Sequence, residues 1–155
     1  MSRPKERIDI FLRAIEGRIL QVLDDILKLG DRDQCAIYAL AITINLAEIE
    51  SYWKENPDQR FGQVLVNLGI IPNIPGFWYY TEEIEIFEAL GVPAREYLLW
   101  GQNYDKDMNL LPQTIRKPIK DLNTDHIKAI LDGKWVVGGH YKKCFEEELK
   151  LREDG

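Results

Sequence analysis

Two expected helix starts carry the side chains with the clearest chemical potential. At the first, Asp58, Arg60 and Gln63 fall within one or two turns, so that a carboxylate, a guanidinium and an amide converge. At the second, Asp125 and His126 open a helix whose dipole favours a neutral imidazole, able to donate and to accept. These groups suit either recognition of a polar ligand or general-base chemistry.

Structural roles for the same groups are simpler. Asp58 follows a proline and is expected to cap its helix, Arg60 to pair with a neighbouring acid, and His126 to be a buried, hydrogen-bonded residue that fixes its helix start. No serine or cysteine stands in a context typical of a nucleophile. The pattern therefore favours binding over catalysis, and the alternative is an enzyme or nucleotide-binding protein with a pocket around His126, Asp125 and Arg60.

The largest concentration of aromatic residues is the segment 77–80, which two acidic residues follow closely. Such rings either fill a core or anchor a partner, and Trp78 is the member expected to point outward. We take this segment as the preferred binding surface. The predicted binding residues are Arg60, Gln63, Trp78, Tyr79, Tyr80, Glu82, Glu83, Asp125 and His126.

Metal binding is not favoured. Asp105, Asp107 and Asn109 have the spacing of a calcium loop, but Leu110 replaces its glycine and Arg116 its bidentate glutamate. A zinc site would need His140 and Cys144, four residues apart on one helix, to be joined by His126. We predict no metal, no cofactor and no catalytic residue.

Composition limits the functional classes. With 155 residues and 45% apolar content, the chain is expected to form one domain. The net charge of −6, from 26 acidic and 20 basic side chains, disfavours nucleic acid and anionic lipid as partners. The sequence has two distant cysteines, no apolar signal segment and no run long enough to span a bilayer. These features predict a cytoplasmic protein that does not insert into membranes.

The first half of the chain predicts two long helices. Apolar residues recur every three or four positions from Ile8 to Leu29, which indicates one amphipathic helix weakened at Gly17 and ended by Gly30. Asp31 or Asp33 then caps a second helix that runs to about Lys54. Residues 35–47 are apolar nearly all round, so this stretch is predicted to be the central buried helix.

Shorter elements are expected after this point. Helices are predicted over 59–68, capped by Asp58, then from a Thr81 cap to Gly91, and from Pro93 to Gly101. Strands are possible over 114–119 and 135–137. The remaining helices are expected over about 124–131, capped by Asn123 or Thr124, and over 141–152.

Two segments are similar to known patterns. Trp53, Pro57, Asp58, Arg60, Gly62, Gln63, Leu65 and Asn67, with the aromatic and acidic residues that follow, resemble a motif of small bacterial and phage accessory proteins. Residues 121–131 (DLNTDHIKAIL) resemble a helix found in phage-associated proteins. No established activity accompanies either pattern. The resemblance implies an accessory protein of a phage or a bacterial mobile element.

Together these observations predict a single, mainly α-helical domain of about six or seven helices with at most a minor strand pair. Within 1–155, residues 1–55 would form a two-helix half, 56–133 the short helices and the aromatic segment, and 134–155 the C-terminal helix. We expect a protein-interaction or inhibitor module whose partner is a host protein or a second copy of this chain. A homodimer is one open form of this hypothesis.

Overall fold

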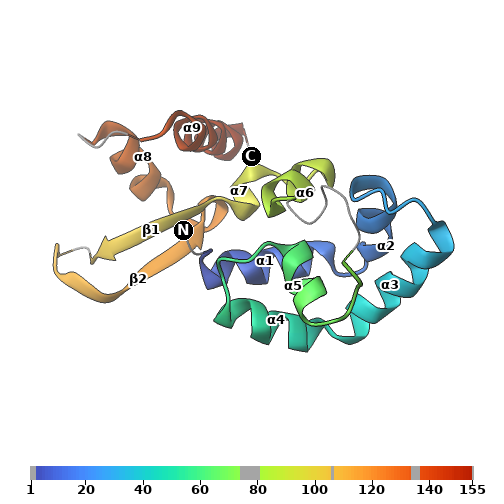
Figure 1. Ribbon diagram of the computed structural model, residues 1–155. Helices are drawn as coiled ribbons and strands as arrows, with labels where there is room; N and C mark the ends of the chain where they lie inside the picture. Colours follow the sequence, from blue (N-terminus) through green and yellow to red (C-terminus); the bar gives the residue numbers. More distant parts are fainter. Residues whose placement is uncertain (1–2, 74–80, 106, 134–136, 155) are drawn as a thin grey trace. The chain divides into compact units, whose positions relative to one another are not determined.

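The computed structural model describes residues 3–73, 81–105, 107–133 and 137–154 (Figure 1). Its contacts divide into two compact units, Met1–Val92 and Pro93–Gly155, and we treat each by itself. The described residues are mainly helical, with a single two-stranded antiparallel sheet. This confirms the predicted fold class.

The N-terminal segment of the first unit is broken where the sequence predicted one helix. It consists of α1 (Lys5–Ile15), α2 (Ile19–Gln21) and the π-helical turn η1 (Val22–Ile26). The prediction of a continuous helix to Leu29 is wrong, because Gly17 adopts a left-handed φ of +78° beyond the end of α1. Glycine reaches this conformation without the steric cost of a side chain, so it ends the helix rather than weakening it.

A second break separates α3 (Arg32–Ile44) from α4 (Leu46–Glu55). Of the two predicted caps it is Asp31 that starts α3, accepting hydrogen bonds from the backbone N–H groups of Asp33 (3.0 Å) and Gln34 (3.2 Å). Asn45, with φ −109° and ψ 16°, leaves the helical region between the two helices, and its side-chain amide donates to the carbonyl oxygen of Ala41. The single predicted helix is therefore two.

The expectation that residues 35–47 form the central buried helix is wrong. Within α3 only Cys35 and Ile42 are fully buried, whereas Ile37, Leu40 and Ile44 are 66%, 64% and 72% exposed. The helix is apolar on every side, but it lies at the edge of its unit and turns one side to the core. Uniform apolarity in the sequence therefore did not predict burial on all sides.

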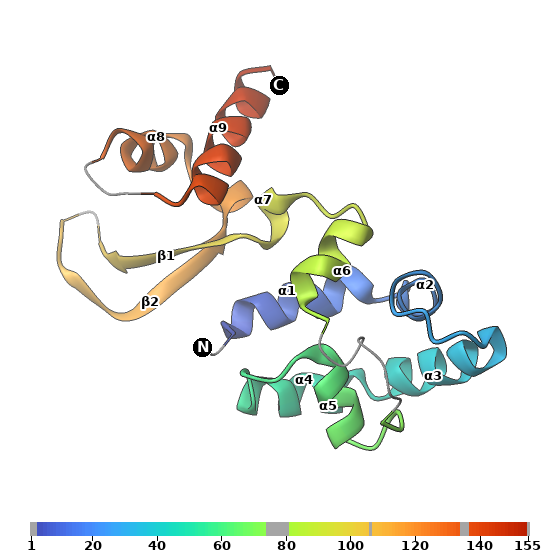
Figure 2. The same ribbon diagram turned by 45° about the horizontal axis from the view of Figure 1, so that its top comes forward.

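The centre of the first unit is Phe11 on α1. Its ring makes edge contacts with Trp53 of α4 (5.4 Å), Phe61 of α5 (Phe61–Asn67; 5.0 Å) and Phe87 of α6 (Glu83–Ala89; 5.5 Å). All four rings are at most 1% exposed. Helix α1 packs against α4 and α6, as two views show (Figures 1 and 2). These aromatic contacts join four helices around one side chain.

The second unit contains α7 (Ala94–Tyr97), β1 (Leu99–Tyr104), β2 (Leu110–Pro118), the 3-10 turn η3 (Ile119–Asp121), α8 (Thr124–Asp132) and α9 (Gly139–Asp154). The strands pair from Leu99 opposite Pro118 to Gln102 opposite Ile115. The strand expected near 114–119 is thus confirmed as part of β2. The helix expected up to Gly101 is wrong, because the backbone becomes extended at Leu98.

Trp100 of β1 and two rings of α9 form the aromatic part of the second unit. Trp100 contacts Tyr141 (6.0 Å) and Phe145 (5.3 Å), and the Tyr141 hydroxyl donates to the carbonyl oxygen of Leu99 at 3.0 Å. Helix α9 therefore holds the start of the hairpin. Across the described residues, no helix combines the length and apolarity needed to cross a membrane.

Two neighbouring positions on α3 give a matched stability test. Ile42→Asp places an unpaired carboxylate at a fully buried site and should unfold the first unit. Leu40→Asp changes a side chain that is 64% exposed and should leave helicity unchanged and the free energy of unfolding within about 0.5 kcal/mol in dilute protein. Circular dichroism with urea unfolding measures both. Unfolding by Leu40→Asp would contradict the placement of α3.

Candidate functional site

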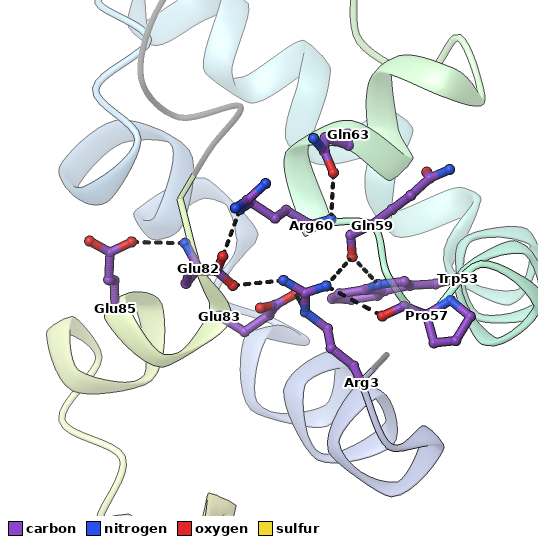
Figure 3. Close-up of polar contacts among 9 residues, drawn as sticks. All are labelled: Arg3, Trp53, Pro57, Gln59, Arg60, Gln63, Glu82, Glu83 and Glu85. Atoms are coloured by element: carbon purple, nitrogen blue, oxygen red, sulfur yellow. Dashed lines mark hydrogen bonds and ion pairs between the residues drawn. The ribbon is translucent and has the colours of Figure 1, made fainter. Parts of the chain in front are cut away.

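Four of the predicted site residues meet in the first unit, around a residue that the sequence did not single out (Figure 3). Arg60 and Gln63 stand at the start of α5, and Glu82 and Glu83 at the start of α6. Arg3 lies just before α1 and reaches both glutamates. We call Arg3, Arg60, Glu82 and Glu83 the arginine–glutamate cluster.

Arg3 is the centre of this cluster. Its Nη2 lies 2.6 Å from Oε2 of Glu82 and its Nε lies 2.7 Å from Oε1 of Glu83. Its Nη1 donates to the carbonyl oxygens of Gln59 (2.9 Å) and Pro57 (3.3 Å). With only 11% of its side chain exposed, the guanidinium ties the segment before α5 to the start of α6.

Glu82 is shared between two guanidinium groups. Its second oxygen, Oε1, lies 2.6 Å from Nε of Arg60. The indole N–H of Trp53 donates to the carbonyl oxygen of Gln59 at 2.8 Å, which is one of the oxygens that Arg3 also holds. The polar cluster therefore borders the aromatic core directly and fixes the same loop from two sides.

The caps of α5 and α6 differ from the predicted ones. The N-cap positions are Arg60 and Glu82, and the predictions of Asp58 and Thr81 as caps are wrong. Gln63 Oε1 accepts the backbone N–H of Arg60 at 2.8 Å, and Glu85 Oε2 accepts that of Glu82 at 2.8 Å. In both helices a residue of the first turn reaches back to the cap, which satisfies a free donor without a capping side chain of the usual type.

The two glutamates of the cluster titrate in opposite directions. Burial raises the pKa of Glu83, and the charge of Arg3 only partly opposes this effect. Burial also acts to raise the pKa of Glu82, but the hydrogen bonds and charges of Arg3 and Arg60 outweigh it, so that this pKa falls below its usual value. The cluster thus holds a firmly ionised carboxylate beside one whose ionisation is costly.

This geometry assigns the cluster to the fold. The guanidinium groups of Arg3 and Arg60 are paired with carboxylates of the same unit, and Gln63 serves a helix cap. The pairing of Arg60 with a nearby acid confirms the structural interpretation of that residue. Sequence reasoning missed Arg3, because an arginine in a charged N-terminal stretch has no local pattern that marks a buried ion pair.

Asp125 and His126 lie in the second unit, at the start of α8. Asn123 is the cap, and its Oδ1 accepts the backbone N–H of His126 at 2.8 Å. His126 is half-buried and Asp125 is exposed, so the expectation of a buried histidine that fixes the helix start is wrong. The backbone, not the imidazole, makes the bond. Since Arg60 belongs to the first unit, neither unit by itself contains the three residues of the predicted pocket.

The aromatic anchor residues Trp78, Tyr79 and Tyr80 lie outside the described residues. Their proposed role as a partner surface stays a prediction.

Cys144 and the calcium-like sequence are explained by the fold around them. Cys144 is buried beside a cavity of about 240 Å³ that Arg95 and Glu148 also line, and burial, with nearby glutamates, raises the pKa of its thiol. Asp105 Oδ1 accepts the backbone N–H groups of Asp107 and Asn109, both at 2.9 Å, and so shapes the hairpin turn. No group of three or more His, Cys, Asp or Glu side chains arranged for a metal is found in the described part of the chain.

The exposed side of α3 is the strongest candidate for a functional surface. Ile37, Leu40 and Ile44 follow one another at steps of three and four residues and form what we call the α3 stripe. No charged residue occurs between Asp33 and Glu48. Exposed apolar patches of this kind mark interaction sites in folded proteins.

Comparison of the chain with protein-family models, curated proteins and solved structures gives no match.

Loss of Arg3 should destabilise the first unit. Arg3→Met leaves Glu83, whose side chain is 4% exposed, without its ion-pair partner, and we expect a loss of about 3 kcal/mol in the free energy of unfolding. The same change in a Glu83→Gln background should cost clearly less, because the amide carries no charge. Urea unfolding of the four proteins completes a double-mutant cycle. Equal losses in both backgrounds would show that Arg3 and Glu83 are not coupled.

The opposite pKa shifts predict opposite pH dependences. Stabilisation by ionised Glu82 is complete above its unfolded pKa and is lost as pH falls through its lowered pKa. The loss in the free energy of unfolding caused by Glu82→Gln should therefore be largest at neutral pH and become smaller in acid. Stabilisation by protonated Glu83 is present below its unfolded pKa and is lost as pH rises through its raised pKa. The free energy of unfolding of Glu83→Gln, relative to that of the wild type, should therefore increase as pH rises.

Urea unfolding from about pH 3 to pH 7 measures both differences, across the range in which ordinary glutamates titrate. If the free energies of unfolding of the wild type and the two variants changed in parallel with pH, the assigned pKa shifts of Glu82 and Glu83 would be contradicted. The same substitution at an exposed glutamate, Glu153→Gln, is the control variant.

Proposed function

We propose that this protein acts by binding another protein chain, and that the α3 stripe is its contact surface. The observation that carries the proposal is the exposure of Ile37, Leu40 and Ile44 on a helix whose other side faces the core. Complete burial of a fully exposed side chain of this type is worth about 1.5–3 kcal/mol before the entropy costs of association, and these three are 64–72% exposed. Among the described residues of the first unit, these three side chains lie on the solvent side of α3.

Support for binding over catalysis comes from the charged residues. The arginine–glutamate cluster is internally paired, and burial raises the pKa of Cys144, which disfavours a reactive thiolate. The motif resemblance to bacterial and phage accessory proteins agrees with an interaction or inhibitor module. Such a module would hold its partner through a helix-in-groove or helix-on-helix contact, which anchors at steps of three and four residues typically make.

Helix α3 follows a short, well-defined cap, which favours a pre-formed contact surface. Asp31 holds the first turn through two backbone hydrogen bonds, and Cys35 and Ile42 fix the helix against its unit. A partner would meet side chains whose backbone is already ordered, so the entropy cost of binding is reduced.

Site-specific photocrosslinking tests the proposal. Replacement of Leu40 by a photoreactive phenylalanine analogue should yield covalent adducts with a protein chain when the protein is irradiated in its source cell. The matched control carries the analogue at Leu151, which is 53% exposed on α9 of the second unit. Mass spectrometry identifies the adducts. Absence of any adduct at position 40, or equal adducts at both positions, would contradict the proposal.

A further inference from the structure

Resting on the proposed function, we infer that the occupant of the α3 stripe is a second copy of this chain, packed antiparallel about Leu40. The stripe is nearly symmetric along the helix. Ile37 precedes Leu40 by three residues and Ile44 follows it by four, so a two-fold axis between Leu40 and Ala41 places Ile37 of one copy against Ile44 of the other. One surface thus serves as its own complement.

Charge supports the same occupant. The stretch between Asp33 and Glu48 contains no charged side chain, and depletion of charge is characteristic of homodimer interfaces. A partner recognised by its own charges would meet no counter-charge in this stretch. A second copy buries apolar side chains against apolar side chains and leaves no charge unpaired.

Asp33 decides the orientation. It lies one turn before Ile37 and continues the line of the stripe towards the start of α3. A parallel pair in register would bring two Asp33 carboxylates together at the seam, where like charges repel. The antiparallel pair places the two Asp33 carboxylates at opposite ends of the seam, and it also opposes the two helix dipoles.

The length of α3 limits the area that the dimer can bury. Helix α3 has 13 residues and is therefore about 20 Å long, so its seam falls at the small end of specific interfaces. We expect a weak dimer, with a dissociation constant on the order of micromolar. The first unit has nine basic and fifteen acidic side chains, so two copies repel each other at low salt and association should strengthen as salt screens this repulsion.

Sedimentation analysis of the full chain from about 1 to 200 µM, at low and high salt, measures this equilibrium. We expect a monomer–dimer transition, a dissociation constant at least tenfold weaker for Leu40→Asp, and no change for Leu151→Asp. Ile37→Ser is a second variant that avoids a new charge and should also weaken the dimer. A wild type that stays monomeric throughout, or dimers unaffected by both stripe variants, would overturn the inference.

Orientation is tested with one introduced cysteine per variant, in addition to the buried Cys35 and Cys144. Mixed Ile37→Cys and Ile44→Cys proteins should form a cross-copy disulfide faster than either variant does alone; faster self-linking of each variant would overturn the antiparallel arrangement. A monomer in solution combined with position-40 crosslinks to a different protein would overturn the second copy while supporting the proposed function. A monomer with no crosslinks at position 40 would overturn both.

Discussion

The packing of Phe11 is the constraint on which the first unit depends. One ring contacts aromatic side chains from α4, α5 and α6, all of them almost completely buried. Helix α1 packs against α4 and α6, whereas α3 packs against α2, η1 and α4. Helix α3 therefore turns one apolar side to the unit and leaves a second one exposed, and this second side is the candidate interaction surface.

The arginine–glutamate cluster completes this arrangement. Arg3 precedes the central helix and holds both the loop before α5 and the first residues of α6. Ion pairs at a protein surface contribute little, but this guanidinium is largely buried and satisfies carbonyl oxygens as well as carboxylates. It therefore fixes the placement of two helix starts, and its loss leaves the buried carboxylate of Glu83 without its partner. Because Arg60 is paired with Glu82 in this way, its pairing is explained by the fold without a ligand.

Sequence patterns predicted the elements better than their surroundings. The helical class, the Asp31 and Asn123 caps and the strand at the end of the hairpin follow from local side-chain chemistry, which the sequence contains in full. The break at Gly17 was underestimated because a glycine inside an apolar repeat is compatible with both a weak helix and a left-handed turn. Arg3 and its glutamates lie about eighty residues apart, and no local pattern indicates such a pairing.

The case of α3 shows where periodicity stops being informative. Cys35, Ile42 and, in α4, Ile49 recur every seven residues and are buried, while the α3 stripe occupies another side of the same helix and is exposed. Both lines are apolar, so hydropathy alone assigns both to a core. The packing of α3 against α2, η1 and α4 distinguishes the line that meets the unit from the line that meets solvent. A helix with two apolar sides in a unit that can cover one of them is best explained by a contact beyond that unit, because an exposed Ile–Leu–Ile line otherwise favours non-specific association.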